Sequence, residues 1–389
     1  MNRRNFMIGL GSLAMAKALP VGASLPSVEP KTLILLELKG GNDGLNTLVP
    51  YQDPLYYELR PRLSIAPGEV IGISKELGLH PALKGLKDSW ESGDLGIIQG
   101  VGYPKPNRSH FSSIDIWESA LDLRGSDGKG WIASLSSKDP SIFEQNPLQA
   151  LILGNPNPGP LENGNLNTLV VQGNGKLLEK VRKIPRLDIS PNGNEALEHI
   201  GSVHQELREN ARMLEESLKS SRISRDSFPK ARLGRTFQLL AKAMSGGLRP
   251  GVVKISLAGF DTHAAQAPVH HRLLRELGDG LRSFREAMLS IGLWNQVLVM
   301  SYSEFGRRAY ENGSAGTDHG TAAPHILMGG RVRGGLYGES PSLRDLDDGD
   351  LKFSTDFRSI YQTVIQRWWG SRYQLGKEKN WESLDCIRV

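Results

Sequence analysis

Five short polar segments carry residue types that could together bind a metal ion and activate an ester. They are residues 40–46, 107–111, 259–263, 303–308 and 316–322. The candidate metal ligands among them are Asp43, Asp261, His263, Glu304, Asp318 and His319. Carboxylate and imidazole ligands suit zinc, manganese, magnesium or calcium rather than copper or an iron–sulfur cluster. We therefore expect one or two divalent ions, with zinc favoured over manganese, magnesium and calcium.

The segment 107–111 supplies the candidate catalytic residues Arg108, Ser109 and His110. It precedes a helical pattern, and a hydroxyl at a helix N-terminus lies near free backbone N–H groups and the positive end of the helix dipole. A metal-bound Ser109 could act as a nucleophile, and Arg108 could hold an anionic group of a substrate. The alternative interpretation makes Ser109 an ordinary helix N-cap and His110 a surface imidazole.

The other segments also have structural interpretations. Asp43 could cap a glycine-rich turn, and His263 could be a structural histidine. Glu304 could form a surface salt bridge with Arg307, and Asp318 could belong to an exposed turn. Three further residues, which could hold the oxygens of a substrate, are Asn42, Asn46 and Arg307.

Near-continuous apolar runs precede or follow these segments and predict buried strands. They are residues 32–38, 95–99, 169–171, 252–257, 297–300 and 325–328. Helical patterns alternate with them, at residues 81–91, 114–121, 195–220, 228–244 and 268–291. This alternation predicts an α/β fold with a mostly parallel sheet and helices on both faces. Because ligands bind beyond the carboxyl ends of the strands in such sheets, we expect the polar segments to converge there.

Composition and charge narrow the class of protein. A chain of 389 residues with 39% hydrophobic and 23% charged residues is not disordered, fibrous or disulfide-based. We predict a single domain over residues 30–389, with a helical insertion or cap at about 176–247. The net charge is +5, but three of the positive residues are Arg3, Arg4 and Lys17. Without the first 23 residues the charge is about +2, so no nucleic-acid partner is predicted.

Residues 1–23 have the pattern of a twin-arginine signal peptide. A basic start with Arg3 and Arg4 precedes an apolar stretch at 8–18, and small residues at 21–23 offer a cleavage site. We therefore expect export by the twin-arginine machinery to the periplasm or the exterior. The alternative is a basic N-terminus that stays attached. No other stretch has the length and apolarity of a membrane span, so the mature chain is not predicted to be embedded in a membrane.

The twin-arginine start and the motifs at 38–50 (LKGGNDGLNTLVP), 107–111 (NRSHF), 260–263 (FDTH), 303–307 (SEFGR) and 317–321 (TDHGT) resemble the domain-of-unknown-function 1501 family. The resemblance extends from about residue 30 to 370. That family is similar in fold to the alkaline phosphatase and sulfatase superfamily, which implies an alkaline phosphatase-like fold. It also implies Asp43 as the first metal ligand, Ser109 as the metal-coordinated nucleophile, and Asp261 and His263 as ligands of the other ion.

The resemblance allows two alignments for the last two motifs, at 303–307 and 317–321. Asp318 and His319 could match the superfamily's Asp–His pair, or His319 could match its final histidine. We favour the second alignment, in which Glu304 takes the acidic role and Phe305 replaces a histidine. It leaves the second ion short of one imidazole.

The resemblance and the segments together predict an exported, metal-dependent hydrolase of phosphate or sulfate esters, acting on a small-molecule or glycan ester. One alternative is a catalytically inactive envelope protein that binds a glycan or a protein partner through the same cleft. Another is a phosphomutase-like transferase, which export disfavours because mutase substrates are mainly cytosolic.

Overall fold

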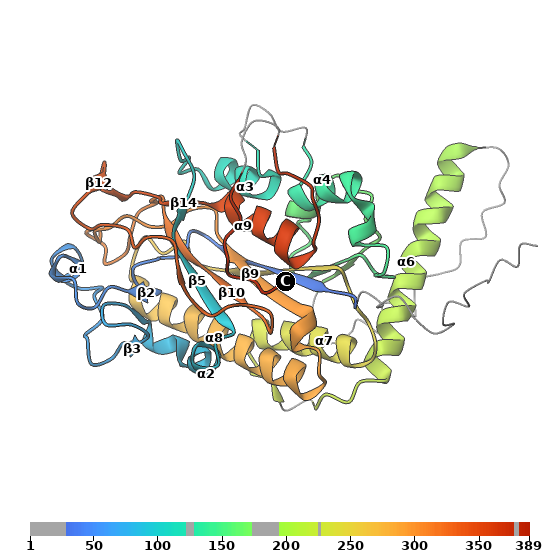
Figure 1. The fold of residues 1–389 in the computed structure, drawn as a ribbon, viewed down its shortest axis with the longest axis horizontal. Helices are drawn as coiled ribbons and strands as arrows, with labels where there is room; N and C mark the ends of the chain where they lie inside the picture. The colour runs from blue at the N-terminus through green and yellow to red at the C-terminus, as the bar shows by residue number, and fades with distance from the viewer. Residues whose placement is uncertain (1–28, 122–127, 173–193, 225–226, 377–380) are drawn as a thin grey trace, which may run out of the picture.

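The computed structural model describes residues 29–121, 128–172, 194–224, 227–376 and 381–389. Its centre is a nine-stranded sheet (Figure 1). The strands are β1 (Thr32–Lys39), β5 (Leu95–Gly102), β6 (Ala150–Leu153), β7 (Thr168–Val171), β8 (Val252–Ala258), β9 (Val297–Tyr302), β10 (Ala323–Met328), β11 (Gly335–Tyr337) and β14 (Thr355–Asp356). Their order is β11-β5-β10-β9-β1-β8-β6-β7, and β14 also pairs with β5. In the described part of this sheet, β10 alone is antiparallel to its neighbours.

Two small sheets lie outside the central one. The first has β2 (Leu48–Val49), β3 (Ile71–Gly72) and β4 (Gly78–Leu79), and the second has β12 (Leu346–Asp347) and β13 (Asp350–Leu351). The α-helices are α1 (Pro54–Leu59), α2 (Lys87–Glu91), α3 (His110–Ser119), α4 (Trp131–Lys138), α6 (Glu195–Lys219), α7 (Arg232–Ser245), α8 (Gln266–Ser290) and α9 (Phe357–Thr363). Short 3₁₀ turns occur at Pro81–Leu86, Pro140–Ile142, Gly159–Leu161 and Trp294–Gln296, and a π-helical turn at Val364–Trp368.

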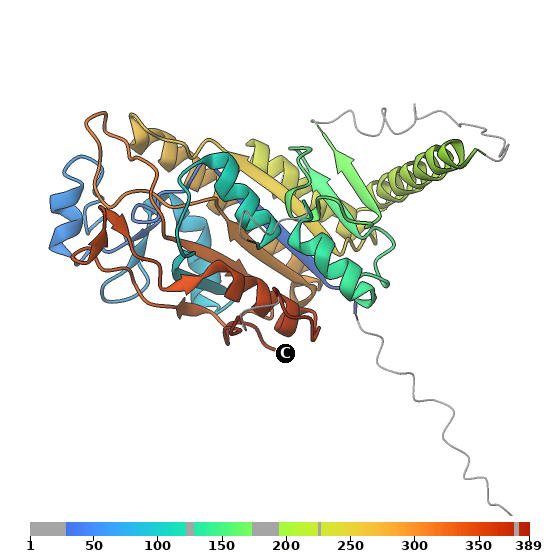
Figure 2. The same ribbon diagram turned by 90° about the horizontal axis from the view of Figure 1, so that it is seen from above.

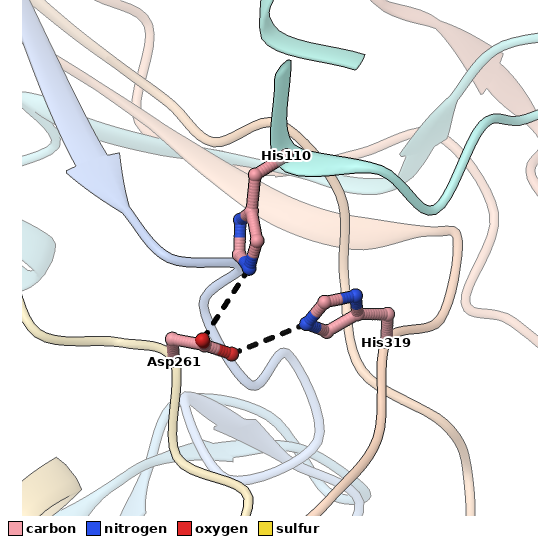
Figure 3. A group of neighbouring side chains, drawn as sticks. All are labelled: His110, Asp261 and His319. Atoms are coloured by element: carbon pink, nitrogen blue, oxygen red, sulfur yellow. Dashed lines mark hydrogen bonds and ion pairs between the residues drawn. The ribbon is translucent and has the colours of Figure 1, made fainter. Parts of the chain in front are cut away.

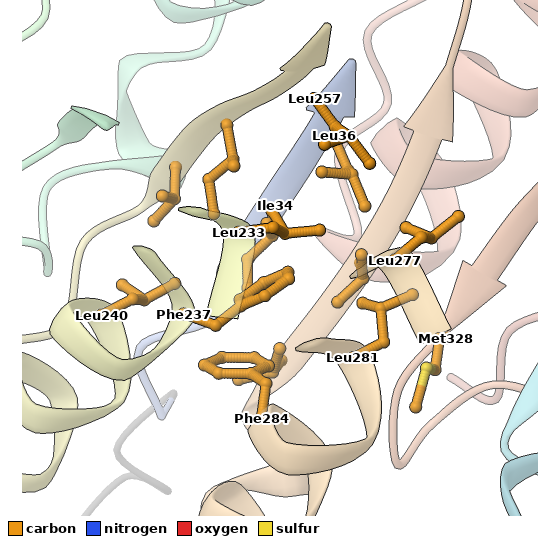
Figure 4. Packing of buried hydrophobic residues seen from close by; sticks show 14 of the residues in the cluster. Ile34, Leu36, Leu233, Phe237, Leu240, Leu257, Leu277, Leu281, Phe284 and Met328 are labelled. Atoms are coloured by element: carbon orange, nitrogen blue, oxygen red, sulfur yellow. The ribbon is translucent and has the colours of Figure 1, made fainter. Parts of the chain in front are cut away.

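Successive residues of β1 point to opposite faces of the sheet, which explains its unbroken apolar run. Ile34 and Leu36 pack with α7 and α8 in one hydrophobic cluster (Figure 4). Leu33 and Leu35 pack on the opposite face with α3, α4 and α9. The two layers of helices are visible above and below the strands in Figure 1.

This architecture confirms the predicted α/β class, with a mostly parallel sheet and helices on both faces. In the region of the predicted insertion, α7 belongs to the layer that covers the sheet, whereas the N-terminal half of α6 extends away from the body (Figures 1 and 2). The predicted signal peptide at 1–23 and the start of the predicted insertion lie outside the described residues. No helix in the described part is both long enough and apolar enough to cross a bilayer.

Candidate metal centre

The sheet topology brings five polar segments to one edge. Residues 40–43, 259–263 and 303–304 follow the parallel strands β1, β8 and β9, so they emerge at the same carboxyl edge. Helix α3 begins at His110 after β5, which runs in the same direction. Because β10 is antiparallel, residues 317–319, which precede it, also arrive at this edge.

His110, Asp261 and His319 form a group whose potential ligand atoms lie within 4.8 Å of one another (Figure 3). The Nε2 atom of His110 lies 3.4 Å from Asp261 Oδ2, and that of His319 lies 3.2 Å from Asp261 Oδ1. His263 adjoins the group, with its Nε2 atom 3.0 Å from Asp261 Oδ1 and 3.0 Å from His319 Nε2. Three imidazoles therefore face one carboxylate, and they come from three separate segments of the chain.

In each of the three imidazoles, Nδ1 contacts an oxygen that accepts a hydrogen bond. The pairs are His110 with Glu304 Oε1 at 2.7 Å, His319 with the Arg108 carbonyl at 2.8 Å, and His263 with Asp318 Oδ1 at 3.0 Å. Since carbonyl and ionised carboxylate oxygens cannot donate, Nδ1 carries the proton in each ring. In the neutral rings the lone pair is then on Nε2, the atom that faces Asp261.

This arrangement fits a divalent cation. Without one, three nitrogen lone pairs would face a carboxylate, and Nε2 of His110 is indeed buried with no hydrogen-bond partner among the described residues. Three nitrogens and one oxygen suit tetrahedral zinc. The carboxylates of Glu304 and Asp318 lie behind two of the rings, as acceptors behind metal-bound histidines commonly do.

The protonation states favour the same interpretation. Burial would raise the pKa of Asp261, but that pKa is lowered to about 2, and the hydrogen bond and the positive charge of Arg307 are among the causes. Burial lowers the pKa of His319, which favours its neutral ring. An ionised carboxylate beside a neutral imidazole is the state in which both can bind a metal ion.

Arg307 joins the loops that carry the centre. Its buried guanidinium donates to Asp261 Oδ1 at 2.8 Å. It also donates to the carbonyl oxygens of Gly40, Gly41, Phe260 and Thr317. These bonds connect the ends of β1 and β8 with the segment before β10. Arg307, predicted as a substrate-binding residue, thus has partners for all its nitrogens within the protein.

Phe305 packs against two of the imidazoles. Its ring centroid lies 4.8 Å from that of His110 and 4.5 Å from that of His319. The ring fits because residue 41 is glycine: a Cβ there would lie 2.5 Å from the Phe305 ring, and Gly41 has φ of +76°. Phe305, predicted to stand where the superfamily has a histidine, therefore fixes ring positions without offering a ligand atom.

The first polar segment lies apart from the three imidazoles. Asp43 is buried and pairs with Arg60, whose Nη1 lies 2.6 Å from Asp43 Oδ2. Asn46 accepts from the same Arg60 nitrogen at 2.9 Å, and Asn42 Oδ1 contacts His270 Nε2 at 3.0 Å. The predictions of Asp43 as a metal ligand, and of Asn42 and Asn46 as substrate-binding residues, stay predictions. Except for Asp43 Oδ1, which is buried without a hydrogen-bond partner among the described residues, their side-chain polar atoms have partners inside the protein, so we do not use them in the proposed site.

Ser109 and Arg108 lie at the start of α3. Ser109 is exposed at the N-cap position, but its side chain forms no capping hydrogen bond. Both of its sequence neighbours take part in the centre. The Arg108 carbonyl oxygen contacts His319 Nδ1, and His110 supplies one of the three imidazoles. The Arg108 guanidinium forms an ion pair with Asp350. The roles predicted for Ser109 and Arg108 stay predictions.

A cleft of about 770 Å³ extends from the centre along α3. Its lining includes His110, Asp261 and Glu304 at one end, and Glu37 and Glu118 further along. Phe111, at the cleft wall, is 84% exposed. The cleft gives a ligand access to the centre and space for a group beyond it.

Two features of the site were not apparent from the sequence. The sequence predicts His110 as a catalytic residue, whereas the structure places its imidazole in the group around Asp261; its position beside Ser109 at the start of a helix is the signal for this location. Glu37 and Lys254 lie within the apolar runs at 32–38 and 252–257. A charged residue within a buried strand was the signal that could have identified them.

Comparison with known proteins gives three sets of findings. No curated protein matches the sequence. Among solved structures, the chain is similar to a protein in the alkaline phosphatase superfamily from Vibrio parahaemolyticus, with 8% identity, a TM-score of 0.38, and 88% of this chain and 67% of that chain covered. It is similar to the PsFucS1 sulfatase from Pseudoalteromonas sp., with 13% identity, a TM-score of 0.39, and 92% and 71% covered. It is also similar to the phosphonate monoester hydrolase from Silicibacter pomeroyi, with 10% identity, a TM-score of 0.41, and 91% of this chain and 76% of that chain covered.

The model of one protein family matches residues 176–370. That range is just over half of the chain and includes Asp261, His263, Asp318 and His319. It confirms the resemblance found in the sequence motifs. The chain belongs to the family described as "Protein of unknown function (DUF1501)".

Proposed function

We propose that this protein is a metal-dependent hydrolase of phosphate or sulfate esters. The observation that carries the proposal is the group of three Nε2 nitrogens that faces Asp261 at one end of a cleft. His110, His263, His319 and Asp261 would hold the ion. Zinc suits this donor set best, and a single cluster of this kind in the described residues favours one ion over two.

A bound ion would act as a Lewis acid that lowers the pKa of a hydroxyl and stabilises developing negative charge. We propose Ser109 as the nucleophile, because its hydroxyl is exposed and both its neighbours contact the centre. The Ser109 oxygen would form a bond to phosphorus or sulfur while the bond to the ester oxygen breaks. The serine proton would pass to the leaving alcohol through solvent. Water would then release the phosphate or sulfate and restore the hydroxyl.

The first test measures metal content. The protein, purified without chelator, is analysed for metals by mass spectrometry beside the variants His110→Ala, Asp261→Ala and His319→Ala. We expect near-stoichiometric metal in the wild type and its loss in all three variants. His199→Ala, which removes an exposed imidazole on α6, is the matched control and should keep the metal. Absence of metal in the wild type, even after reconstitution, would refute the centre.

The second test measures turnover on a panel of chromogenic phosphate and sulfate esters. We expect hydrolysis that depends on the metal and that falls by several orders of magnitude in Ser109→Ala. Unchanged hydrolysis in that variant would show that Ser109 is not the nucleophile. Bound metal without turnover on any ester would instead favour an inactive binding protein, the function that the replacement of a histidine by Phe305 suggests.

Export is a separate proposal, supported by the pattern of residues 1–23. Replacing Arg3 and Arg4 together by lysine should retain the precursor in the cytoplasm, as cell fractionation would reveal. Equal amounts of the processed chain outside the cytoplasm in both cases would contradict twin-arginine export.

A further inference from the structure

The cleft ends in a buried group of three charged side chains and one tyrosine that the proposed chemistry does not use. Glu37 on β1, Lys254 on β8 and Tyr302 on β9 are each only 1% exposed, and Glu118 on α3 is 7% exposed. The three strand residues continue the rows that face α3, where Leu35, Val252 and Met300 are apolar. Charged groups at such positions are costly unless they are paired.

The contacts within this group are direct. Lys254 Nζ lies 3.3 Å from Glu37 Oε2 and 3.5 Å from Glu118 Oε1, and it donates to the Asn157 carbonyl at 3.0 Å. The Tyr302 hydroxyl donates to Glu118 Oε1 at 3.2 Å. Lys254 and Tyr302 thus contact the same oxygen of Glu118, Oε1. Neither of these contacts involves the other oxygen of Glu118, Oε2, and Glu118 lines the cleft.

The charges do not balance within the group. Two carboxyl groups share one ammonium group, so ionisation of both leaves one negative charge without a partner. Burial accordingly raises the pKa of Glu118 to about 7, against the attraction of Lys254 and with repulsion from Glu37. The cleft as a whole is acidic: its lining has two lysines, and its acidic residues are Glu37, Asp115, Glu118, Glu162, Asp261 and Glu304.

The space beside Glu118 depends on Gly159. A Cβ at this position would lie 2.2 Å from Glu118 Oε1 and 3.0 Å from Lys254 Cε, and Gly159 has φ of +52°. Any side chain there would therefore fill the end of the cleft. The opening at Glu118 requires glycine in this turn.

Helix α3 sets the distance between this group and the metal centre. His110, Ile114 and Glu118 are spaced four residues apart, so they share one helix face, and all three line the cleft. Eight residues of helix place Glu118 about 12 Å from His110 along the axis. A ligand held at the centre would pass over Ile114 before it reached Glu118.

We propose that Glu118 is a specificity residue that binds an ammonium group of the substrate. The substrate class is an ester whose reacting group sits at the metal centre and whose alcohol part carries a primary amine at its far end. The location of the reacting group rests on the proposed function. With an ammonium group of the ligand beside Glu118 Oε2, the two negative charges of Glu37 and Glu118 are balanced by the positive charges of Lys254 and the ligand. A neutral hydroxyl in the same place leaves one negative charge without a partner.

The test compares ligands that differ only in the amine. Calorimetry at about pH 8 measures binding of 6-aminohexylphosphonate and of hexylphosphonate to the metal-loaded protein. We expect the amine to strengthen binding about tenfold or more, the value of a charged hydrogen bond. In Glu118→Gln this advantage should disappear while hexylphosphonate binds as before. Asp115→Asn, which removes an exposed carboxylate from the same helix and cleft, is the control and should keep the advantage.

A second ligand pair separates this inference from the proposed function. Ligand-observed NMR compares butylammonium with butanol, neither of which has a group for the metal centre. If neither phosphonate binds but butylammonium binds in a Glu118-dependent way, the proposed metal chemistry fails and the subsite stands. If the amine gives no advantage in either pair, the subsite is refuted. Gly159→Ala keeps every charge but fills the space beside Glu118, so it should also remove the binding advantage of the amine. This variant tests the subsite even if Glu118→Gln does not fold.

Discussion

The buried carboxyl of Glu118 should make the stability of the protein fall as the pH rises. In the unfolded chain the pKa of Glu118 has its ordinary value of 4.5, and in the folded protein burial raises it to about 7. Between these values the folded state holds a proton that the unfolded state has released. Unfolding therefore releases a proton, and the free energy of unfolding decreases with pH across this window. The favourable contribution is complete below pH 4.5 and is lost as the pH rises through about 7.

The size of this effect follows from the shift. One pKa unit equals about 1.36 kcal/mol, so a rise from 4.5 to about 7 corresponds to about 3 kcal/mol. Most of it falls between about pH 5 and pH 8. Glu118→Gln keeps the shape of the side chain and its contact with Tyr302 but cannot ionise. Relative to the wild type, the variant should therefore gain about 2 to 3 kcal/mol of stability from the lower pH to the higher.

Urea denaturation measures this difference. Unfolding curves of the wild type and Glu118→Gln are recorded by tryptophan fluorescence at about pH 5 and pH 8, with equal metal content and with refolding as a check of reversibility. The Asp115→Asn variant, whose carboxylate is exposed, should follow the wild type at both values. If the difference between the wild type and Glu118→Gln is the same at both values of pH, Glu118 does not titrate with a raised pKa and the charge imbalance that we infer is absent.

Two further predictions concern Asp318, which lies behind His263, and the buried Asp43, which lies apart from the imidazoles. Asp318→Asn removes the charged acceptor behind His263, so metal affinity measured by competition with a chelating dye should fall by about 10- to 100-fold, and unchanged affinity would mean that this imidazole is not a ligand. Arg60→Met leaves the buried carboxylate of Asp43 without its partner, so the free energy of unfolding near neutral pH should fall by about 3 to 5 kcal/mol. A loss below about 1 kcal/mol in urea denaturation would show that Asp43 is not held as a buried anion.

Much of the fold could be predicted because buried parallel strands have distinctive runs of apolar residues. The run at 32–38 became β1, and those at 252–257 and 297–300 lie within β8 and β9. No strand is predicted from the sequence at β6, although its four residues, Ala150–Leu153, are all apolar and buried. The direction of β10 was also not predictable, because an apolar run has no polarity and only its pairing with β5 and β9 shows that it is antiparallel.

The sequence indicated which segments meet at the site but not which atoms face each other. Five polar segments were expected at one edge, and four of them contribute to the three imidazoles, Asp261 and their acceptors. Whether Glu304 approaches an ion directly or through His110 depends on side-chain orientation, which spacing does not encode. Similarly, Asp43 forms a buried ion pair with Arg60, which the spacing of these two residues in the sequence does not predict.

The hydrogen bonds of Arg307 have a consequence for how an ion would be taken up. They hold the loops after β1 and β8 and before β10 in place through atoms of the protein alone. The ligand set is therefore preorganised, and little conformational entropy remains to be lost when an ion arrives. Selection among metals then depends on how well each accepts a fixed geometry, which favours ions of tetrahedral preference over those that need several mobile oxygen ligands.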